Sequence, residues 1–525
     1  MTQLLRPICR GVAAITFVLG AWTGCSSNAP AGSTGTTGTG TASGGSGGPA
    51  FASGGNGASP ANGAGTGGGT GGGVPGTGGD GPKGSGGQPP TATGGGGATS
   101  ASGAGTGGGA AGGGQGASGG KAGSTSSSGT GGGAAGGAGS GVLGSAGSSF
   151  MATGMRAFPQ NVKSPNCSYP TGTKSSDVTA SYELWKSTVV VSDGAGGFRR
   201  VKKPDSGSVI GSTVSEGIGY GMVLAVYMGD QALFDDLWKY SQLHLDGQGF
   251  MNWEIAPDGS VTAGGNGGAT DGDEDITWAL VMADKQWGGK GTLSDTYLNL
   301  AKHMIDLIWQ FEVDHTRGEM LKPGNNWGGA DTTNPSYFAP AYYRVFGQVS
   351  GNTANWNKVV DSSYSIISLS LNATNGNATN GLVPAWCSST GVPQMGLGFQ
   401  NDATRTPFRV GQDYCWFGEP RAKTYLAMIT NFYVGVGVDK ITNGYALNGT
   451  PQPDKVYLPA GLQAASFVGP AGVGAMSDPK YQQFVNDAYA EVATLKLTAG
   501  TIYYQKSWSA LSLLMMTGNL IDFTR

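Results

Sequence analysis

Three short acidic segments of the sequence each stand at the start of an apolar, helix-like run. Glu216 lies in Ser-Glu-Gly-Ile-Gly-Tyr-Gly-Met, Asp271 in Ala-Thr-Asp-Gly-Asp-Glu-Asp-Ile and Asp402 in Asn-Asp-Ala-Thr-Arg. A pair of carboxyl groups can serve as general acid and general base, which is the chemistry of glycoside hydrolysis. Glu216 is the leading candidate for the acid, because burial ahead of an almost wholly apolar helix favours a protonated carboxyl.

Helix capping is the alternative explanation of these carboxylates. Acidic side chains at a helix start are favoured by the unpaired backbone amides and by the helix dipole. For Asp273, Glu274 and Asp275, which share a helix start with Asp271, capping explains the pattern at least as well as catalysis. Capping explains Glu216 less well, because that residue stands among glycines.

The histidine and glycine patterns favour no competing chemistry. The three histidines, His244, His303 and His315, form no His-Glu-x-x-His pattern, so we expect neither a metal site nor a Ser-His-Asp triad. The Gly-x-Gly-x-Gly run at 217–221 follows no predicted strand, as a dinucleotide-binding loop would. The sequence therefore predicts no metal and no organic cofactor.

Aromatic side chains supply the second half of a sugar site, because the C–H faces of a pyranose stack on aromatic rings. Trp253 and Trp327 lie in Gly- and Asn-rich loops, where no core is expected. Tyr337 opens an apolar segment, and Tyr504 directly precedes the last one. For any single ring, packing in the core is the ordinary alternative.

Two kinds of helical segment alternate along the C-terminal part of the chain. Segments that are apolar on all sides predict buried helices, and segments with one apolar stripe predict surface helices. The predicted inner segments are 217–228, 276–283, 337–346, 402–417, 467–476 and 507–517. The predicted outer segments are 176–186, 231–244, 294–311, 354–369, 420–434 and 478–496. Six inner helices enclosed by six outer helices form an (α/α)6 barrel, whereas the alternative, a helical solenoid, would need a fixed-period repeat that the sequence lacks.

The barrel prediction decides where the candidate residues meet. Inner helices of such a barrel run parallel to one another, so their N-terminal ends share one side. We therefore expect Glu216, Asp271 and Asp402 to converge on one cleft. A short hairpin is also predicted, with strands at 187–191 and 198–202.

Composition divides the chain into three parts. The 100 glycines are concentrated in residues 26–149, where Gly, Ser, Thr and Ala leave too little apolar surface for a core. We predict an export signal at 1–25, a disordered tether at 26–149 and one catalytic domain at 150–525; a low-complexity adhesive is the alternative for the tether. The net charge of −3 comes with no concentrated basic face, so we expect no nucleic-acid partner, and we expect a monomer.

The first 25 residues have the pattern of a bacterial export signal. Arg6 and Arg10 precede an apolar run at 11–22 that is too short to span a membrane. Cys25 follows a small residue, as the lipid-bearing cysteine of a lipoprotein signal does, although Trp22 replaces the usual aliphatic residue. We expect a protein that is either secreted or anchored through a lipid on Cys25 at the bacterial cell surface or outer membrane. That lipid is the one membrane contact we expect.

Three cysteines remain for the catalytic domain, and none is part of a Cys-x-x-Cys pair. An exported protein can form one disulfide among Cys167, Cys387 and Cys415. The spacing leaves all three pairings open.

Five motifs together resemble glycoside hydrolase family 8. Besides the three acidic segments they are Leu-Lys-Pro-Gly-x-x-Trp-Gly-Gly and Asn-Pro-Ser-Tyr-Phe-Ala-Pro-Ala, and they follow the family's order between about residues 179 and 519. The resemblance implies an (α/α)6 barrel that hydrolyses a β-linked polysaccharide with inversion. We expect an endoglucanase of the cellulase type, which cleaves within chains of β-1,4-glucan.

The resemblance also implies roles for the candidate residues. Glu216 takes the position of the general acid, Asp402 that of the general base and Asp271 that of a carboxylate that holds the sugar at the cleavage point. Asp413 is the rival base, ranked below Asp402 because it would lie deeper in the barrel. The positions that line the family's cleft are Trp253, Trp327, Arg405 and Tyr504.

Two departures from the family pattern bear on the substrate. Asn326 stands where cellulases commonly have arginine before the tryptophan, and Asn401 stands where they commonly have tyrosine before the base. The resemblance therefore implies the class of reaction more firmly than the identity of the glycan that is cleaved. The alternatives are the same chemistry on xylan, mixed-linkage β-glucan or chitosan, and a non-catalytic carbohydrate-binding protein, against which the three retained carboxylates argue.

Overall fold

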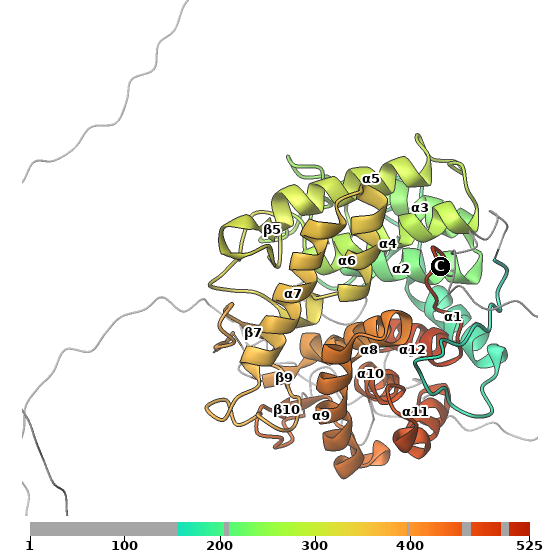
Figure 1. The fold of residues 1–525 in the computed structure, drawn as a ribbon. Helices are drawn as coiled ribbons and strands as arrows, with labels where there is room; N and C mark the ends of the chain where they lie inside the picture. The colour runs from blue at the N-terminus through green and yellow to red at the C-terminus, as the bar shows by residue number, and fades with distance from the viewer. Residues whose placement is uncertain (1–155, 204–208, 396–397, 454–463, 495–502) are drawn as a thin grey trace, which may run out of the picture. The chain divides into compact units, whose positions relative to one another are not determined.

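The structure is a computed structural model in which twelve α-helices and several two-stranded ribbons make up the described part of the chain (Figure 1). The described residues are 156–203, 209–395, 398–453, 464–494 and 503–525. The predicted export signal and tether, residues 1–149 with Cys25, lie outside the described residues.

Six of the helices form an inner ring. They are α2 (Ser215–Met228), α4 (Thr270–Gln286), α6 (Pro340–Ser350), α8 (Arg405–Phe417), α10 (Ala465–Ala475) and α12 (Tyr503–Met516). α10 is buried at every position, as a helix that is apolar on all sides must be. Trp278 of α4 stacks on Tyr342 of α6 with ring centres 4.3 Å apart, so side chains connect these two neighbours in the ring.

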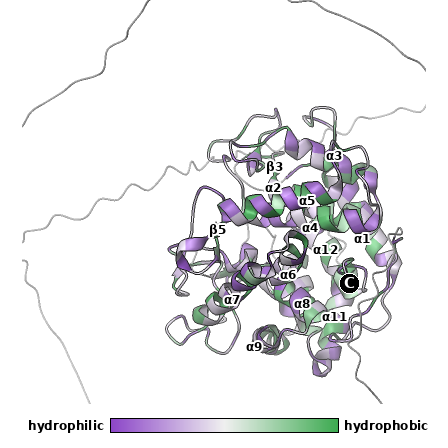
Figure 2. Cartoon of the chain, turned by 45° about the horizontal axis from the view of Figure 1, so that its top comes forward, coloured by the Kyte–Doolittle hydropathy of each residue, from purple (hydrophilic) through white to green (hydrophobic). Residues whose placement is uncertain are grey.

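The other six helices lie outside the ring and alternate with the inner ones along the chain. They are α1 (Ser175–Val189), α3 (Gln231–Gln242), α5 (Tyr297–Leu307), α7 (Thr353–Ser370), α9 (Pro420–Val436) and α11 (Gln482–Thr494). Figure 2 shows hydrophilic and hydrophobic residues mixed along α5 and α7, as one-sided burial requires. The predicted (α/α)6 barrel is confirmed, and each predicted inner or outer segment overlaps a helix of the expected kind.

Glycines let α2 and α4 approach closely at their N-terminal ends. A Cβ atom added to Gly219 of α2 would lie 2.7 Å from the Cβ of Asp275, and one added to Gly272 of α4 would lie 2.6 Å from the Ser215 backbone. Any larger residue would therefore push the two helices apart. The glycines that follow Glu216 and Asp271 in the sequence thus let the first turns of the two helices touch.

Short antiparallel ribbons connect the helices. The predicted hairpin is present, but its strands are only two residues each, because α1 continues to Val189. The paired strands are β1 (Val190–Val191) with β2 (Arg200–Val201), β3 (Thr213–Val214) with β4 (Glu254–Ile255), β5 (Val313–Asp314) with β6 (Met320–Leu321), β7 (Trp386–Cys387) with β8 (Pro393–Gln394), and β9 (Gly398–Gln400) with β10 (Gly444–Ala446).

A disulfide joins Cys167, which precedes α1, to Cys415 in the last turn of α8. Cys387 is free and buried. The structure thus selects one of the three pairings that the sequence left open. In the described residues, no helix combines the length and the apolarity that crossing a membrane requires.

Candidate active site

The starts of three inner helices bring three carboxylates onto one guanidinium group. Glu216 lies in the first turn of α2, Asp271 in the first turn of α4 and Asp402 in the short 3-10 helix η4 (Asn401–Thr404) before α8. Arg405, the first residue of α8, donates through Nη1 to Glu216 Oε2 at 2.7 Å and to Asp271 Oδ2 at 2.5 Å. Its Nη2 lies 3.5 Å from Asp402 Oδ1. The structure therefore brings the three predicted carboxylates together.

The four side chains differ in their access to solvent. Arg405 is 1% exposed and Asp271 5%, whereas Glu216 is 17% and Asp402 33% exposed. A general acid and a general base must reach the glycosidic oxygen and a water molecule. Glu216 and Asp402 are exposed enough to meet this requirement, whereas Asp271 and Arg405 are buried.

Further hydrogen bonds orient the two exposed carboxylates. The Tyr503 hydroxyl at the start of α12 donates to Glu216 Oε1. Asn334 Nδ2 donates to Asp402 Oδ2 at 3.2 Å. Both carboxyl groups therefore have a donor besides Arg405, which fixes the direction of their oxygens.

The cluster contains three carboxyl groups but only one positive charge, that of Arg405, so ionisation of all three would leave a net negative charge. Burial raises the pKa of Asp271 to about 7, because the lowering effect of Arg405 is opposed by Glu216 and Asp402. The Asp271 carboxyl group therefore exchanges its proton near neutral pH. Burial, followed by the charge of Glu216, raises the pKa of Tyr503 well above its ordinary value, so its hydroxyl remains a donor.

The two exposed carboxylates are close enough to act on one glycosidic bond. Because both contact the same planar guanidinium, their nearest oxygens lie less than about 9 Å apart, and inverting glycosidases place their carboxyl groups roughly 6.5–9.5 Å apart. This upper bound is compatible with the separation of the carboxyl groups in an inverting enzyme.

Aromatic rings extend from the carboxylates toward the surface. Tyr337 lies under Arg405, with its ring centre 4.9 Å from the guanidinium carbon, and meets Trp386 at 5.9 Å. Trp386 in turn contacts Trp327 at 5.4 Å, and Trp327 is 41% exposed. Trp327 also lines a cavity of about 550 Å³. Trp327, the exposed end of this run, is suited to stacking on a sugar ring.

The remaining predicted site residues also lie near the cluster. The Trp253 carbonyl accepts a hydrogen bond from the Ser215 amide, which places the main chain of Trp253 beside the start of α2, and the indole N–H donates to the Gly264 carbonyl at 2.8 Å. The Tyr504 hydroxyl donates to the Asn401 carbonyl at 3.2 Å, next to Asp402.

Several residues of the site were not among those predicted. Trp386 precedes a buried cysteine in a two-residue strand, and no local pattern distinguishes it from a core residue. Asn334 stands in the Asn-Pro-Ser-Tyr motif, which could have directed attention to it. Tyr503 stands beside the predicted Tyr504, and only the position of α12 shows which of the two hydroxyls reaches Glu216.

The structure places Asp413, the rival base, apart from this cluster. It is fully buried, accepts from Arg344 Nε at 2.7 Å and accepts from the Tyr364 hydroxyl at 2.6 Å. It follows Arg405 by eight residues, or about 12 Å along α8. A carboxylate held by two donors away from solvent has no access to a catalytic water.

The capping interpretation of the acidic residues after Asp271 is wrong. All three are buried, and their partners lie on other elements. Asp275 pairs with Arg409 through two bonds of 2.7 Å, and Glu274 accepts from the Tyr343 hydroxyl at 2.7 Å. Asp273 faces Glu312, another carboxyl group.

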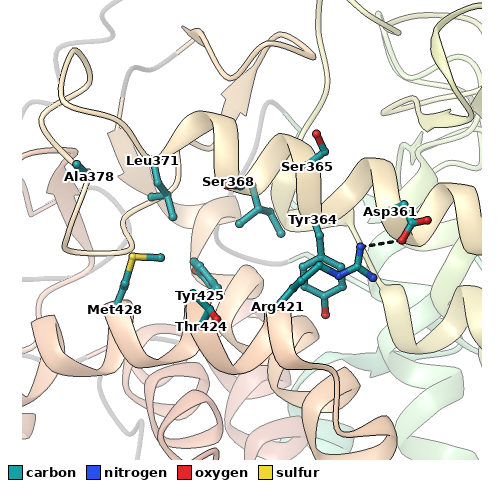
Figure 3. A pocket seen from close by; sticks show the side chains of 11 residues that line it. Asp361, Tyr364, Ser365, Ser368, Leu371, Ala378, Arg421, Thr424, Tyr425 and Met428 are labelled. Atoms are coloured by element: carbon teal, nitrogen blue, oxygen red, sulfur yellow. Dashed lines mark hydrogen bonds and ion pairs between the residues drawn. The ribbon is translucent and has the colours of Figure 1, made fainter.

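A separate cavity of about 510 Å³ lies between the outer helices α7 and α9 (Figure 3). Its charged lining residues, Asp361 and Arg421, pair with each other at 2.7 Å, as the dashed line in Figure 3 marks. No residue of the carboxylate cluster lines it. The chemistry of the site therefore belongs to the helix starts and not to this cavity. Among the described residues, no group of three or more His, Cys, Asp or Glu side chains is arranged to hold a metal ion.

Comparisons with known proteins show which family the chain resembles. The sequence model of the family described as glycosyl hydrolases family 8 matches residues 156–518. Endoglucanase A of Acetivibrio thermocellus is 40% identical over 383 residues, which is 70% of this chain and 77% of that protein. Endoglucanase 2 of Ruminiclostridium josui is 40% identical over 342 residues, 64% of this chain and 70% of that protein. The apo structure of a β-1,3-1,4-glucanase from Paenibacillus sp. X4 matches with a TM-score of 0.60 and 28% identity, covering 69% of this chain and 98% of that one.

Proposed function

Because the chain belongs to glycosyl hydrolases family 8, we propose that it cleaves β-1,4-glucan internally and with inversion of the anomeric configuration. The single observation that carries the proposal is the guanidinium of Arg405, which joins Glu216, Asp271 and Asp402 at one opening of the barrel. The names of the relatives at 40% identity, all endoglucanases, support the choice of substrate.

Each carboxylate has a distinct role in the proposed reaction. Glu216 protonates the glycosidic oxygen as the bond to the leaving sugar breaks. Asp402, the most exposed of the three, removes a proton from the water that attacks the anomeric carbon from the opposite face. Asp271, held by Arg405, accepts hydrogen bonds from the hydroxyl groups of the sugar at the cleavage point and opposes its developing positive charge.

A substrate panel tests the proposal. The full chain is incubated with carboxymethylcellulose, lichenan, xylan and chitosan, and reducing ends are measured together with the fall in viscosity. We expect the highest rate on carboxymethylcellulose, with viscosity falling early because an endo-acting enzyme cuts within the chain. Highest activity on xylan or chitosan would contradict the proposed substrate, and no activity on any glycan would contradict an enzymatic role.

The stereochemistry is tested separately on a soluble β-linked oligosaccharide. NMR spectra recorded during the first minutes should show the α-anomer as the initial product, since one displacement inverts the configuration. Initial formation of the β-anomer would show a retaining reaction. The Glu216→Gln variant is the matched control for background hydrolysis.

Mixed-linkage β-glucan is the second candidate substrate. It is favoured by the similarity to a protein described as a β-1,3-1,4-glucanase. Asn326, at a position that cellulases commonly fill with arginine, lines a cavity of about 440 Å³ near Trp327. A kcat/KM on lichenan above that on carboxymethylcellulose would favour this candidate.

We also propose that residues 1–25 direct export and that 26–149 tether the enzyme to the cell surface through a lipid on Cys25. The support is the sequence pattern alone. Labelling of cells with a radioactive fatty acid should mark the wild type but not the Cys25→Ala variant. A protein that is exported equally and unlabelled in both forms would favour plain secretion.

A further inference from the structure

A buried pair of carboxyl groups lies beside the carboxylate cluster. Asp273 belongs to the first turn of α4, and Glu312 ends the short π-helix η1 (Ile308–Glu312) that follows α5. Neither residue is exposed to solvent, and the two carboxyl groups face each other. Two ionised carboxylates only accept hydrogen bonds, so a hydrogen bond between these two groups requires a proton on one of them.

The groups around the pair do not supply enough hydrogen bonds or positive charge to stabilise both carboxyl groups in their ionised form. Among the described residues, no side chain or amide makes a well-formed hydrogen bond to any of the four carboxyl oxygens. The Thr270 hydroxyl and the Lys322 ammonium group face Glu312 and lower its pKa, but burial outweighs both. The ammonium group donates instead to the carbonyls of Phe311 at 2.7 Å and Asn325 at 2.8 Å. A fully ionised pair would therefore be a poorly compensated buried charge, which is a costly arrangement.

The charges around the pair also favour its protonated form. Burial raises the pKa of Asp273 well above its ordinary value and that of Glu312 to about 8. Three of the four titratable groups that face the pair from α4, from the loop after α3 and from the segment after β6 are acidic. These groups are Asp246, Asp271, Glu274 and Lys322.

The pair is connected to the active site through the first turn of α4. Asp273 follows Asp271 by two residues, so both carboxyl groups move with the same turn. Gly268, just before the helix, lies against Asp273, since a Cβ atom added there would be 2.7 Å from Asp273 Oδ2. Repulsion between Asp273 and Glu312 would therefore displace the turn that presents Asp271 to Arg405.

We propose that Asp273 and Glu312 share a proton and thereby position Asp271, so that loss of this proton disables the active site in alkaline solution. The effect on catalysis rests on the function proposed above, whereas the sharing of the proton does not. Both residues are positioning residues, because they act through Asp271 and do not touch the substrate.

Two isosteric variants test the proposal in the full chain. In Glu312→Gln the amide donates to Asp273 without a dissociable proton, and Asp273→Asn reverses the arrangement. Glu319→Gln is the matched control, since Glu319 pairs with Lys358 at 3.3 Å away from this site. For each protein, kcat is measured from pH 6 to 10 on the best soluble substrate and is scaled to that protein's own maximum.

In the wild type and in Glu319→Gln, we expect kcat to fall reversibly by about tenfold per pH unit above the dissociation of the shared proton. In Glu312→Gln and Asp273→Asn, that fall should shift upward by at least one pH unit. The infrared spectrum of the wild type near neutral pH should contain a C=O band of a protonated carboxylic acid that Glu312→Gln lacks and Glu319→Gln retains. This band is informative even if the protein hydrolyses none of the glycans, which separates this proposal from the proposed function.

The proposal would be overturned by an alkaline fall that is unchanged in both variants, or by an infrared spectrum in which Glu312→Gln loses no acid band. Failure of both variants to fold would also overturn it, because an amide that replaces a hydrogen-bonding acid preserves the contact. Folding is checked by circular dichroism at the pH of each measurement.

Discussion

Replacement of Arg405 tests whether the carboxylate cluster depends on the shape of the guanidinium group or only on its positive charge. Its guanidinium is planar, pairs with three carboxylates and is 1% exposed. Arg405→Lys keeps the positive charge but replaces the fork with one ammonium group, which cannot occupy both ends of the fork. Because Nη1 alone donates to both Glu216 and Asp271, we expect the ammonium group to keep these two contacts and to leave Asp402 without its charged partner.

The size of the effect follows from the one contact, between Nη2 and Asp402, that lysine cannot replace. A hydrogen bond to a charged group contributes about 1.5–3 kcal/mol, so its absence raises the activation free energy by about that amount. This corresponds to a fall in kcat/KM of roughly 10–10²-fold. The free energy of unfolding should change by much less, because the charge remains inside the cluster.

Arg405→Met removes the charge as well and leaves the carboxylates unpaired. Breaking buried ion pairs in this way costs about 3–5 kcal/mol of stability. The pKa of Asp271 is already raised to about 7, so protonation below that pH relieves the repulsion. We therefore expect the destabilisation to be larger at pH 8 than at pH 5.

The assays are steady-state kinetics on a soluble glucan and urea unfolding at both pH values. Arg421→Lys is the matched control, because Arg421 also pairs with two carboxylates, those of Asp361 and Glu419, but its side chain is 44% exposed. It should cost less than about 1 kcal/mol of stability and leave the kinetics unchanged. If Arg405→Lys kept kcat/KM within threefold of the wild type, the fork would not be what organises the cluster, and the reasoning would fail.

Three further predictions concern the roles of the carboxylates, the disulfide and the aromatic run. Glu216→Gln should lower turnover on glucan by about 10²–10⁴-fold but less on an aryl glycoside with a good leaving group, whereas Asp402→Asn should impair both substrates alike; parallel losses in the two variants would contradict the assigned roles. Reduction of the Cys167–Cys415 disulfide, whose cysteines are 248 residues apart, should lower the free energy of unfolding by about 2–5 kcal/mol in urea titrations, and superimposable curves would refute this. Trp327→Ala should raise KM for a long glucan up to about tenfold with little change in kcat, and an unchanged KM would argue against sugar stacking at this ring.

The helical architecture could be predicted because its signals are local. Apolar runs such as 467–476 and amphipathic runs such as 354–369 differ within a few turns of sequence, and their alternation already describes an inner and an outer ring. The glycines after Glu216 and Asp271 are also visible in the sequence, although only the packing of α2 on α4 shows their purpose. The candidate carboxylates were identifiable because each stands at the start of an inner helix.

The partners of these carboxylates depended on the closed ring. Arg405 meets residues 189 and 134 positions away in the chain, and Glu312 meets Asp273 only because a π-helical turn ends α5 beside α4. The same holds for the disulfide, where spacing allowed three pairings, and for Asp413, whose partners Arg344 and Tyr364 lie on two other helices, α6 and α7.

The physical reason lies in the range of the interactions. The hydrophobic periodicity of a helix follows from which side of it is buried, so each segment carries this information by itself. A buried charge, in contrast, is stable only where another part of the chain supplies its donor or its counter-charge. The sequence by itself therefore determined which helices form and which carboxylates head them, and the tertiary structure decided which of those carboxylates share one guanidinium, which share a proton and which remain open to water.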